Sequence, residues 1–124
     1  MAENYVYTKP NILIRELAKQ GLFGDIYFGE GQYIHELKAF NEITKWRRKW
    51  QTGRNGCTYP THSLGPVLQW FGDSVRSVSC FGSGHHYKDP SGHQYENEDT
   101  ITMICKTTRG GLIEIRVDML SDRP

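Results

Sequence analysis

The chain has 124 residues, a formal net charge of +1 and a hydrophobic content of 37%, which fits one soluble globular domain over residues 1–124. The balanced charge argues against nucleic acid and anionic membranes as partners, and no apolar run approaches the ~20 residues of a membrane span. Cys57, Cys80 and Cys105 are too widely spaced for a disulfide framework or a zinc site. We therefore expect buried thiols and a reducing, cytoplasmic location.

The first elements predicted are a helix and a strand. Residues 8–24 favour a helix, with Pro10 in its first turn and Gly21 at its C-terminal stop. Residues 25–37 follow directly and are rich in Ile, Tyr and Phe, which is typical of a strand.

The predicted strand has two distinct sides. Its period of two places Tyr33 and His35 on the same side. Gly29 and Gly31 interrupt the strand, and they permit a bulge or the close approach of a neighbouring backbone.

The middle of the chain predicts a long loop and then a second helix. Residues 38–58 show no clear period and predict a long loop with room for a helical turn. Long loops inside compact domains are often functional. Residues 61–72 favour a short helix, with Thr61 as its N-cap and Pro66 in or near its first turn.

The second half of the chain predicts three strands, and polar residues with a Pro-Ser-Gly turn separate the first strand from the second. An Arg-Gly-Gly hairpin joins the last two. Together with the helices, they predict an α+β domain in which helices cover one face of a mostly antiparallel sheet. The predicted strands are residues 74–82, 100–108 and 111–120.

The last predicted strand has one apolar side and one side that carries Glu114, Arg116 and Asp118. Opposite charges spaced two residues apart can pair with those of a symmetry mate across a two-fold interface. We therefore expect a homodimer that forms sheet to sheet, with Arg116 near its middle. The alternative is a solvated sheet face, which antiparallel sheets tolerate.

Three stretches, in this order and spacing, resemble the C-terminal domain of the Gfo/Idh/MocA oxidoreductases: "QGLFGDIYFGEGQYIHEL", "GCTYPTHSLGPVLQWFG" and "VRSVSC". The resemblance covers nearly the whole chain. Proteins of this family have an N-terminal Rossmann domain that binds NAD or NADP, and their C-terminal domain supplies the substrate side and the subunit interface. By this resemblance, the chain is a fragment of a longer enzyme.

Two motifs of the family are absent from the chain. No G-x-G-x-x-G turn follows a strand, and the Glu-Lys-Pro motif near the nicotinamide is missing. Because the Gly-rich turn and helix start that hold a pyrophosphate are lacking, we expect no cofactor-binding residues and no activity on this chain alone. NAD or NADP then belongs to the missing Rossmann domain of the parent.

The second stretch is similar to the NAD-dependent glycosidase branch, of the α-N-acetylgalactosaminidase type. In that branch the residues matching Tyr33, Arg47, Tyr59 and His62 surround the sugar. The resemblance implies catalytic roles for Tyr59, His62 and Tyr33, and substrate binding by Arg47 and by His35. Glu36 stands where the branch commonly has Asp.

Dehydrogenases of the wider family usually carry an Asp four residues before the motif histidine, with a Gly between them. Those positions here are Thr58 and Pro60. We therefore expect His62 to lack the carboxylate neighbour that would tune it as a base.

The implied reaction is redox-assisted glycoside cleavage. NAD takes a hydride from C3 of a carbohydrate, a Tyr or His base removes the acidified C2 proton, and the C1–oxygen bond breaks by elimination. Water then adds and the hydride returns. Two alternatives stay open: a domain of a sugar or polyol dehydrogenase, and a non-catalytic binding or scaffold domain in which Tyr59 and His62 only begin a helix.

Two tempting patterns favour simpler interpretations. The basic, aromatic run at residues 45–50 is too short for a nucleic-acid groove. His85, His86 and His93 lie in what reads as an exposed, turn-rich loop, with no spacing that would bring metal ligands together. We therefore expect no metal site.

Overall fold

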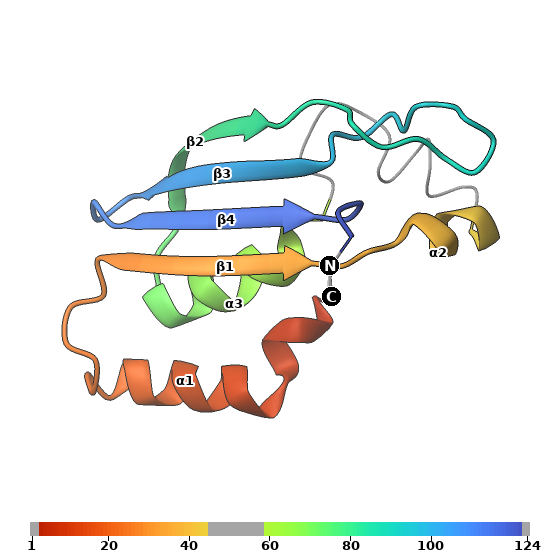
Figure 1. Cartoon of the computed structure of the whole chain (residues 1–124). Coiled ribbons are helices and arrows are strands. Elements are labelled where there is room, and N and C mark those ends of the chain that lie inside the picture. Colours follow the sequence, from red (N-terminus) through yellow and green to blue (C-terminus); the bar gives the residue numbers. More distant parts are fainter. Residues whose placement is uncertain (1–2, 45–58, 123–124) are drawn as a thin grey trace.

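A computed structural model describes residues 3–44 and 59–122 of the chain. Within these ranges the chain forms four strands, three α-helices and one short 3-10 helix (Figure 1). In chain order they are η1 (Asn4–Tyr7), α1 (Lys9–Lys19), β1 (Phe28–Ile34), α2 (Lys38–Ile43), α3 (Thr61–Phe71), β2 (Val75–Gly82), β3 (Thr100–Thr107) and β4 (Leu112–Asp118).

The strands form one sheet in the order β1-β4-β3-β2. β3 and β4 form the predicted antiparallel hairpin, with Met103 opposite Ile115, and β2 pairs antiparallel with β3. β1 pairs with β4 in the parallel sense, with Tyr33 opposite Val117. The predicted α+β class with a mostly antiparallel sheet is confirmed.

The core lies between the sheet and α3, which runs behind the sheet in Figure 1. The period-two alternation predicted on β3 and β4 is observed, because every second side chain is buried. Burying such an apolar side chain contributes about 1.5–3 kcal/mol relative to leaving it exposed. The buried members are Ile101, Met103, Cys105, Ile113, Ile115 and Val117 from the strands and Val67 and Phe71 from α3.

Two glycines allow α3 to lie directly on β1, which is the second of the two alternatives, a bulge or a close backbone approach, that the sequence left open. A Cβ atom at Gly31 would come within 2.6 Å of the carbonyl oxygen of Ser63, and one at Gly29 within 2.7 Å of the Phe71 ring. Any larger residue at Gly31 would therefore push against the backbone of the first turn of α3. This contact fixes the start of α3 against the second half of β1.

The helix ends differ in part from the prediction. Gly72 ends α3 in the left-handed conformation as expected (φ 55°), but Pro60 rather than Thr61 is the N-cap and no side chain caps the helix. Pro66 lies inside the helix, and its ring nitrogen cannot donate to the carbonyl oxygen of His62. α1 ends at Lys19, and Gly21 just beyond it has the left-handed conformation expected at the C-terminal stop (φ 76°). η1 was not predicted, and α2 occupies the start of the predicted loop.

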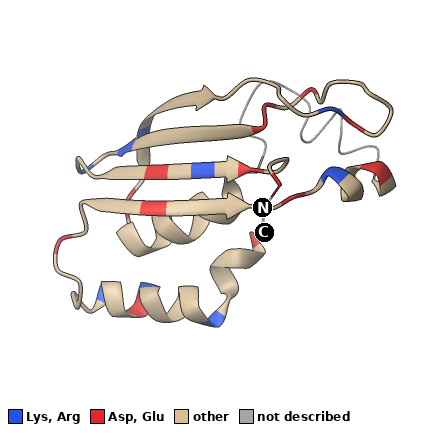
Figure 2. Cartoon of the chain, viewed as in Figure 1, with Lys and Arg blue, Asp and Glu red and all other residues tan. Residues whose placement is uncertain are grey.

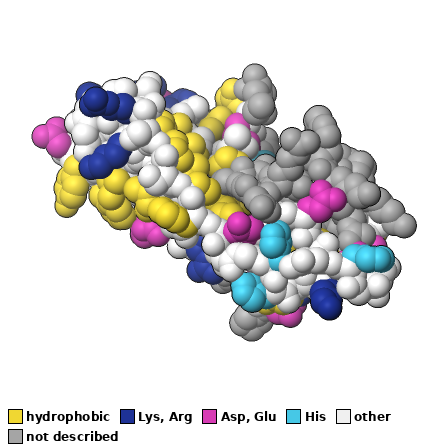
Figure 3. All heavy atoms as spheres, turned by 90° about the horizontal axis from the view of Figure 1, so that it is seen from above, with side chains coloured by type: hydrophobic (Ala, Val, Ile, Leu, Met, Phe, Trp, Pro, Cys, Tyr) yellow, Lys and Arg dark blue, Asp and Glu magenta, His cyan; other side chains and the backbone are white. Residues whose placement is uncertain are grey.

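β2 lies at one edge of the described sheet, opposite the β1 edge, and most of its side chains are exposed. Val78 is 52% exposed and Phe81 69%. Seen from above, hydrophobic side chains gather at one end of the molecule and histidines at the other (Figure 3). Cys105 is buried as expected, whereas Cys80 on β2 is exposed, so that expectation is wrong for Cys80. Cys57 lies outside the described residues.

The polar segment between β2 and β3 is turn-rich and largely exposed as predicted, but it also contains buried residues. Asp89, Tyr95, Asn97 and Asp99 are each at least 95% buried. Backbone N–H groups of the same segment satisfy the two carboxylates: Asp89 accepts those of residues 91 and 93, and Asp99 accepts that of His86. The predicted turn is present, with Gly92 in the left-handed conformation.

Candidate functional site

The structure brings Tyr33, Tyr59 and His62 together at one edge of the sheet. The His62 ring centroid lies 4.9 Å from that of Tyr33 and 4.9 Å from that of Tyr59. The two tyrosine rings stack, with centroids 5.7 Å apart and planes 14° apart. All three residues named from the sequence as catalytic candidates therefore belong to one cluster of rings.

The fold explains why these residues meet. Tyr33 follows Gly31 by two residues on β1, so it shares the face that α3 covers. His62 is in the first turn of α3 and precedes Ser63, whose backbone rests on Gly31. Tyr59 comes just before this turn and packs against the core with Tyr33.

A carboxylate also lies beside His62, contrary to the sequence-based expectation. Oε2 of Glu3 is 3.2 Å from Nδ1 of His62, an ion-pair distance when the ring is protonated. The angles are not those of a hydrogen bond, and Nδ1 is buried without another partner. Both side chains are less than one-fifth exposed. The expectation considered only residues close to His62 in the sequence. Glu3 is distant in the sequence, and the fold brings it beside His62.

Tyr5 is a further member of the cluster that the sequence did not reveal. Its ring centroid lies 5.1 Å from that of His62 and 6.4 Å from that of Tyr33, the latter in an edge-to-face arrangement. Glu3 and Tyr5 both belong to the short segment around η1, since Oε1 of Glu3 accepts the N–H of Tyr5. An acidic residue followed by an aromatic one is too common a pattern to have signalled this.

The residues predicted to bind substrate are less central. His35 lies just beyond β1, with its exposed ring 6.1 Å from that of Tyr33, so it borders the cluster. Glu36 instead accepts the backbone N–H of Lys38 at the start of α2. Arg47 lies outside the described residues, and its prediction stays untested.

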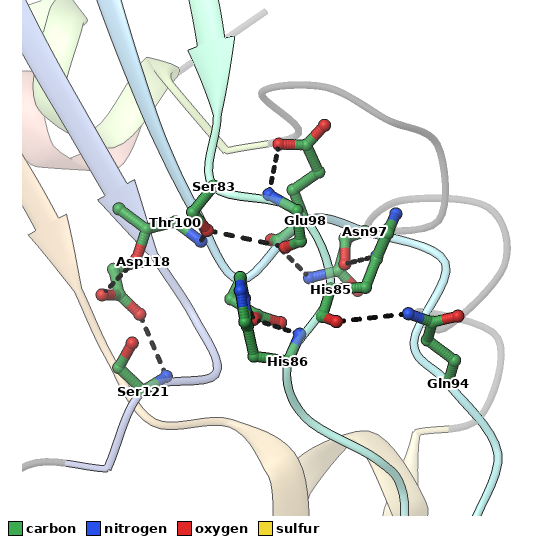
Figure 4. A network of polar contacts seen from close by, with 11 residues as sticks. Ser83, His85, His86, Gln94, Asn97, Glu98, Thr100, Asp118 and Ser121 are labelled. Carbon is green, nitrogen blue, oxygen red and sulfur yellow. Dashed lines mark hydrogen bonds and ion pairs between the residues drawn. The ribbon is translucent and has the colours of Figure 1, made fainter.

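A separate polar network occupies the segment between β2 and β3 (Figure 4). Nδ1 of His86, whose side chain is 67% exposed, lies 2.8 Å from the buried carboxylate of Asp99. Burial raises the pKa of Asp118, but hydrogen bonds from Thr100 and Ser121 outweigh this effect and hold the pKa below its ordinary value. Within residues 3–44 and 59–122, no group of three or more His, Cys, Asp or Glu side chains could hold a metal ion.

The opposite end of the sheet carries a pocket of about 470 Å³. Tyr27, Trp70, Asp73 and Arg109 help to line it, and of the predicted site residues that the structure describes, Tyr33, His35, Tyr59 and His62, none does so. Arg109 donates to the carbonyl oxygens of residues 71 and 72 at the end of α3. The guanidinium thus has a structural role there, and the ring cluster remains the better candidate for chemistry. None of the helices in the described part is long and apolar enough to cross a membrane.

Solved structures share this fold. An NAD binding oxidoreductase from Klebsiella pneumoniae superimposes with a TM-score of 0.74 at 17% identity, covering 99% of this chain and 34% of that one. The WlbA dehydrogenase from Bordetella pertussis, solved with NADH and UDP-GlcNAcA, gives a TM-score of 0.69 at 20% identity, covering 97% and 36%. At these identities the likeness concerns the fold alone.

Curated relatives are closer in sequence. A glycosyl hydrolase family 109 protein from Shewanella pealeana and the alpha-N-acetylgalactosaminidase of Shewanella oneidensis are each 37% identical over 145 aligned positions. Both alignments cover the whole chain but only 32% of the relative, so the chain spans about a third of their length. Residues 7–124 match the family described as glycosyl hydrolase 109, C-terminal domain. The resemblance inferred from the motifs is thereby confirmed, and the chain belongs to the glycosyl hydrolase 109 family as its C-terminal domain.

Proposed function

We propose that this chain is the substrate-binding domain of an NAD- or NADP-dependent enzyme that cleaves glycosides by a redox-assisted route. The observation that carries the proposal is the packing of Tyr33, Tyr59 and His62 into one cluster. Family membership adds a carbohydrate substrate, since one relative is named an alpha-N-acetylgalactosaminidase. The free thiols of Cys80 and Cys105 are consistent with a reducing, cytoplasmic location.

The cofactor has no site on this chain. The sequence lacks the Gly-rich turn that leads into a helix N-terminus, which a pyrophosphate requires. A dinucleotide bound by a Rossmann domain in the parent would supply the oxidation that makes a neighbouring C–H bond acidic. A solved structure of the same fold contains both NADH and a sugar nucleotide, which is consistent with separate cofactor-binding and substrate-binding domains in the parent.

The residues of the cluster suit proton transfer. A tyrosine hydroxyl and an imidazole can each accept and return a proton at moderate pH, and a positioned base of this kind contributes about 10²–10⁴-fold in rate. Tyr59 and His62 are adjacent, so one can act on the sugar while the other takes part in proton exchange. The carboxylate of Glu3 faces Nδ1 of His62, where it would stabilise the protonated form of the ring.

A two-carboxylate hydrolysis suits the cluster poorly. That mechanism requires two acidic side chains on either side of the glycosidic bond. Of the residues in the described ranges, the cluster contains one carboxylate, Glu3, and it faces His62. This arrangement favours a Tyr and His mechanism over the usual acid pair.

The test uses a version of the protein fused to its Rossmann domain. His62→Ala and Tyr59→Phe should each lower turnover by about 10²–10⁴-fold while leaving the circular dichroism spectrum unchanged. His86→Ala is the matched control, because His86 lies in the separate polar network and should change turnover little. Turnover of His62→Ala at the parent rate would contradict the proposal.

The same protein can separate hydrolysis from simple dehydrogenation. A redox-assisted glycosidase returns its hydride, so a released sugar should appear without net formation of NADH. A sugar or polyol dehydrogenase would accumulate NADH in proportion to product. A protein that binds sugar but does neither would be the non-catalytic binding domain.

We also propose a homodimer through the open face of the sheet. Acidic and basic residues alternate along β4 (Figure 2), and the burial pattern of the strand places Glu114 and Arg116 on the face opposite its buried side chains. Phe28 and Phe81, which register places on the same side, are 45% and 69% exposed. Asp118 cannot contribute as first expected, because it is 1% exposed and binds Arg116 within the strand at 3.3 Å. Arg116 itself stays 41% exposed and accessible to a mate.

A further inference from the structure

The backbone of Tyr5 is held in place more firmly than its position near the chain end would suggest. Its N–H donates to Glu3 at 3.2 Å. Its carbonyl oxygen accepts from Nδ2 of Asn11 at 2.7 Å and from both the hydroxyl and the N–H of Thr8, at 3.0 and 3.2 Å. These four hydrogen bonds fix the residue without help from its own side chain.

The ring of Tyr5 is fixed next to the cluster but remains partly open. The ring of Tyr5 contacts the rings of His62 and Tyr33, at centroid distances of 5.1 and 6.4 Å. The residue is nevertheless 44% exposed, whereas Tyr33, Tyr59 and His62 are only partly accessible. Tyr5 is thus the most open of these four rings.

A rigid, open aromatic ring beside proton-transfer groups suits binding of a sugar ring. The face of an aromatic ring is electronegative, and the C–H face of a pyranose is apolar and weakly positive, so the two attract each other as they leave water. A ring whose backbone is already ordered loses little conformational entropy on binding. Tyrosine is favoured in binding sites for this reason.

We propose that Tyr5 is a substrate-binding residue whose ring packs against the C–H face of the saccharide held by the Tyr33, Tyr59 and His62 cluster. This inference rests on the proposed function and adds a specificity element to it. A saccharide with a continuous apolar face should bind better than one whose hydroxyl groups interrupt that face. The role belongs to the ring and not to the hydroxyl group.

The test measures binding of N-acetylgalactosamine to this chain by saturation-transfer NMR, which detects weak ligands. Tyr5→Phe should bind within about twofold of the wild type, and Tyr5→Ala about three- to tenfold more weakly. Tyr5→Leu keeps apolar bulk without aromaticity and should also weaken binding. Tyr7→Ala is the matched control, because Tyr7 lies in the same η1, is 63% exposed and should leave binding unchanged.

The outcomes separate the two proposals. Weaker binding by the Ala and Leu variants, with Phe and the Tyr7 control unaffected, supports the inference. Binding at wild-type strength by a folded Ala or Leu variant overturns it and leaves the proposed function intact. No saccharide signal from the wild-type chain would count against the substrate-binding role itself, and the assignment of Tyr5 would then fail with it.

Discussion

Gly31→Ala should destabilise the fold and disturb the site at the same time. The new Cβ would lie 2.6 Å from the carbonyl oxygen of Ser63 and 2.9 Å from Cδ1 of Ile115. Ordinary contact begins at 3.4 Å, and a helix backbone cannot rotate away as a side chain can. The first turn of α3, which carries His62, must therefore retreat from β1 by several tenths of an ångström.

The expected magnitude is the difference between two effects. Overpacking of this kind costs about 1–3 kcal/mol. Replacing glycine by alanine within a strand stabilises the folded state by about 0.5–1 kcal/mol, because the unfolded chain with alanine has less conformational entropy to lose on folding. With the middle value of each range, the net loss of unfolding free energy is roughly 1–1.5 kcal/mol. With a urea m-value of about 2 kcal/mol/M, the midpoint of unfolding should fall by roughly 0.5–0.75 M.

Urea unfolding monitored by tryptophan fluorescence measures the loss, and the ring-proton shifts of His62 report the displacement. Gln32→Ala is the control, since Gln32 is exposed on the same strand. Gly29→Ala meets only the side chains of Phe71 and Val67, so it should cost stability but shift the His62 signals less. A Gly31→Ala protein as stable as the wild type would refute direct contact between α3 and β1.

Three further results are expected. Titration calorimetry of this chain with NAD or NADP should show no binding, and micromolar affinity, about −8 kcal/mol, would mean that the chain holds a cofactor site. A hydrogen bond from Thr108, opposed by burial and joined by one from the N–H of Arg109, holds the pKa of Asp73 well below its usual range. Because the pKa of Asp73 is lowered in the folded state, its ionised carboxylate stabilises the fold fully above about pH 4, the pKa of an unfolded Asp. This stabilisation is lost as the pH falls from there through the lower folded-state pKa. Asp73→Asn should flatten the acid side of the stability profile, and an unchanged profile would show that Asp73 is not the group responsible. Light scattering should show a dimer that Arg116→Glu weakens, whereas a well-folded wild-type monomer at high concentration would exclude the sheet interface.

Local patterns in the sequence predicted most of the fold. The alternation in β3 and β4 follows from one buried face, so it is visible in residues two apart. Gly72 marks the end of α3 because a left-handed residue there favours glycine. Gly31 likewise indicated close backbone approach, and this contact brings the candidate site residues together.

The parts that sequence patterns missed depend on contacts between distant segments. The parallel pairing of β1 with β4 joins elements from opposite ends of the chain, and no local pattern encodes it. The approach of Glu3 to His62 has the same origin. The buried Asp89 and Asp99 were misread because a polar composition predicts exposure unless the backbone donors that satisfy these carboxylates are known.

The short N-terminal segment that carries η1 lies largely outside the part of the chain that matches the family. The match to the family begins at residue 7, so an expression plasmid designed from that match would omit Glu3 and Tyr5. Such a protein would keep the sheet, α3 and the Tyr33, Tyr59 and His62 rings, yet His62 would lose its carboxylate neighbour and one of its ring contacts. The family match thus covers the sheet and helices of the shared fold. The residues that contact His62 also include Glu3 and Tyr5, which precede that match.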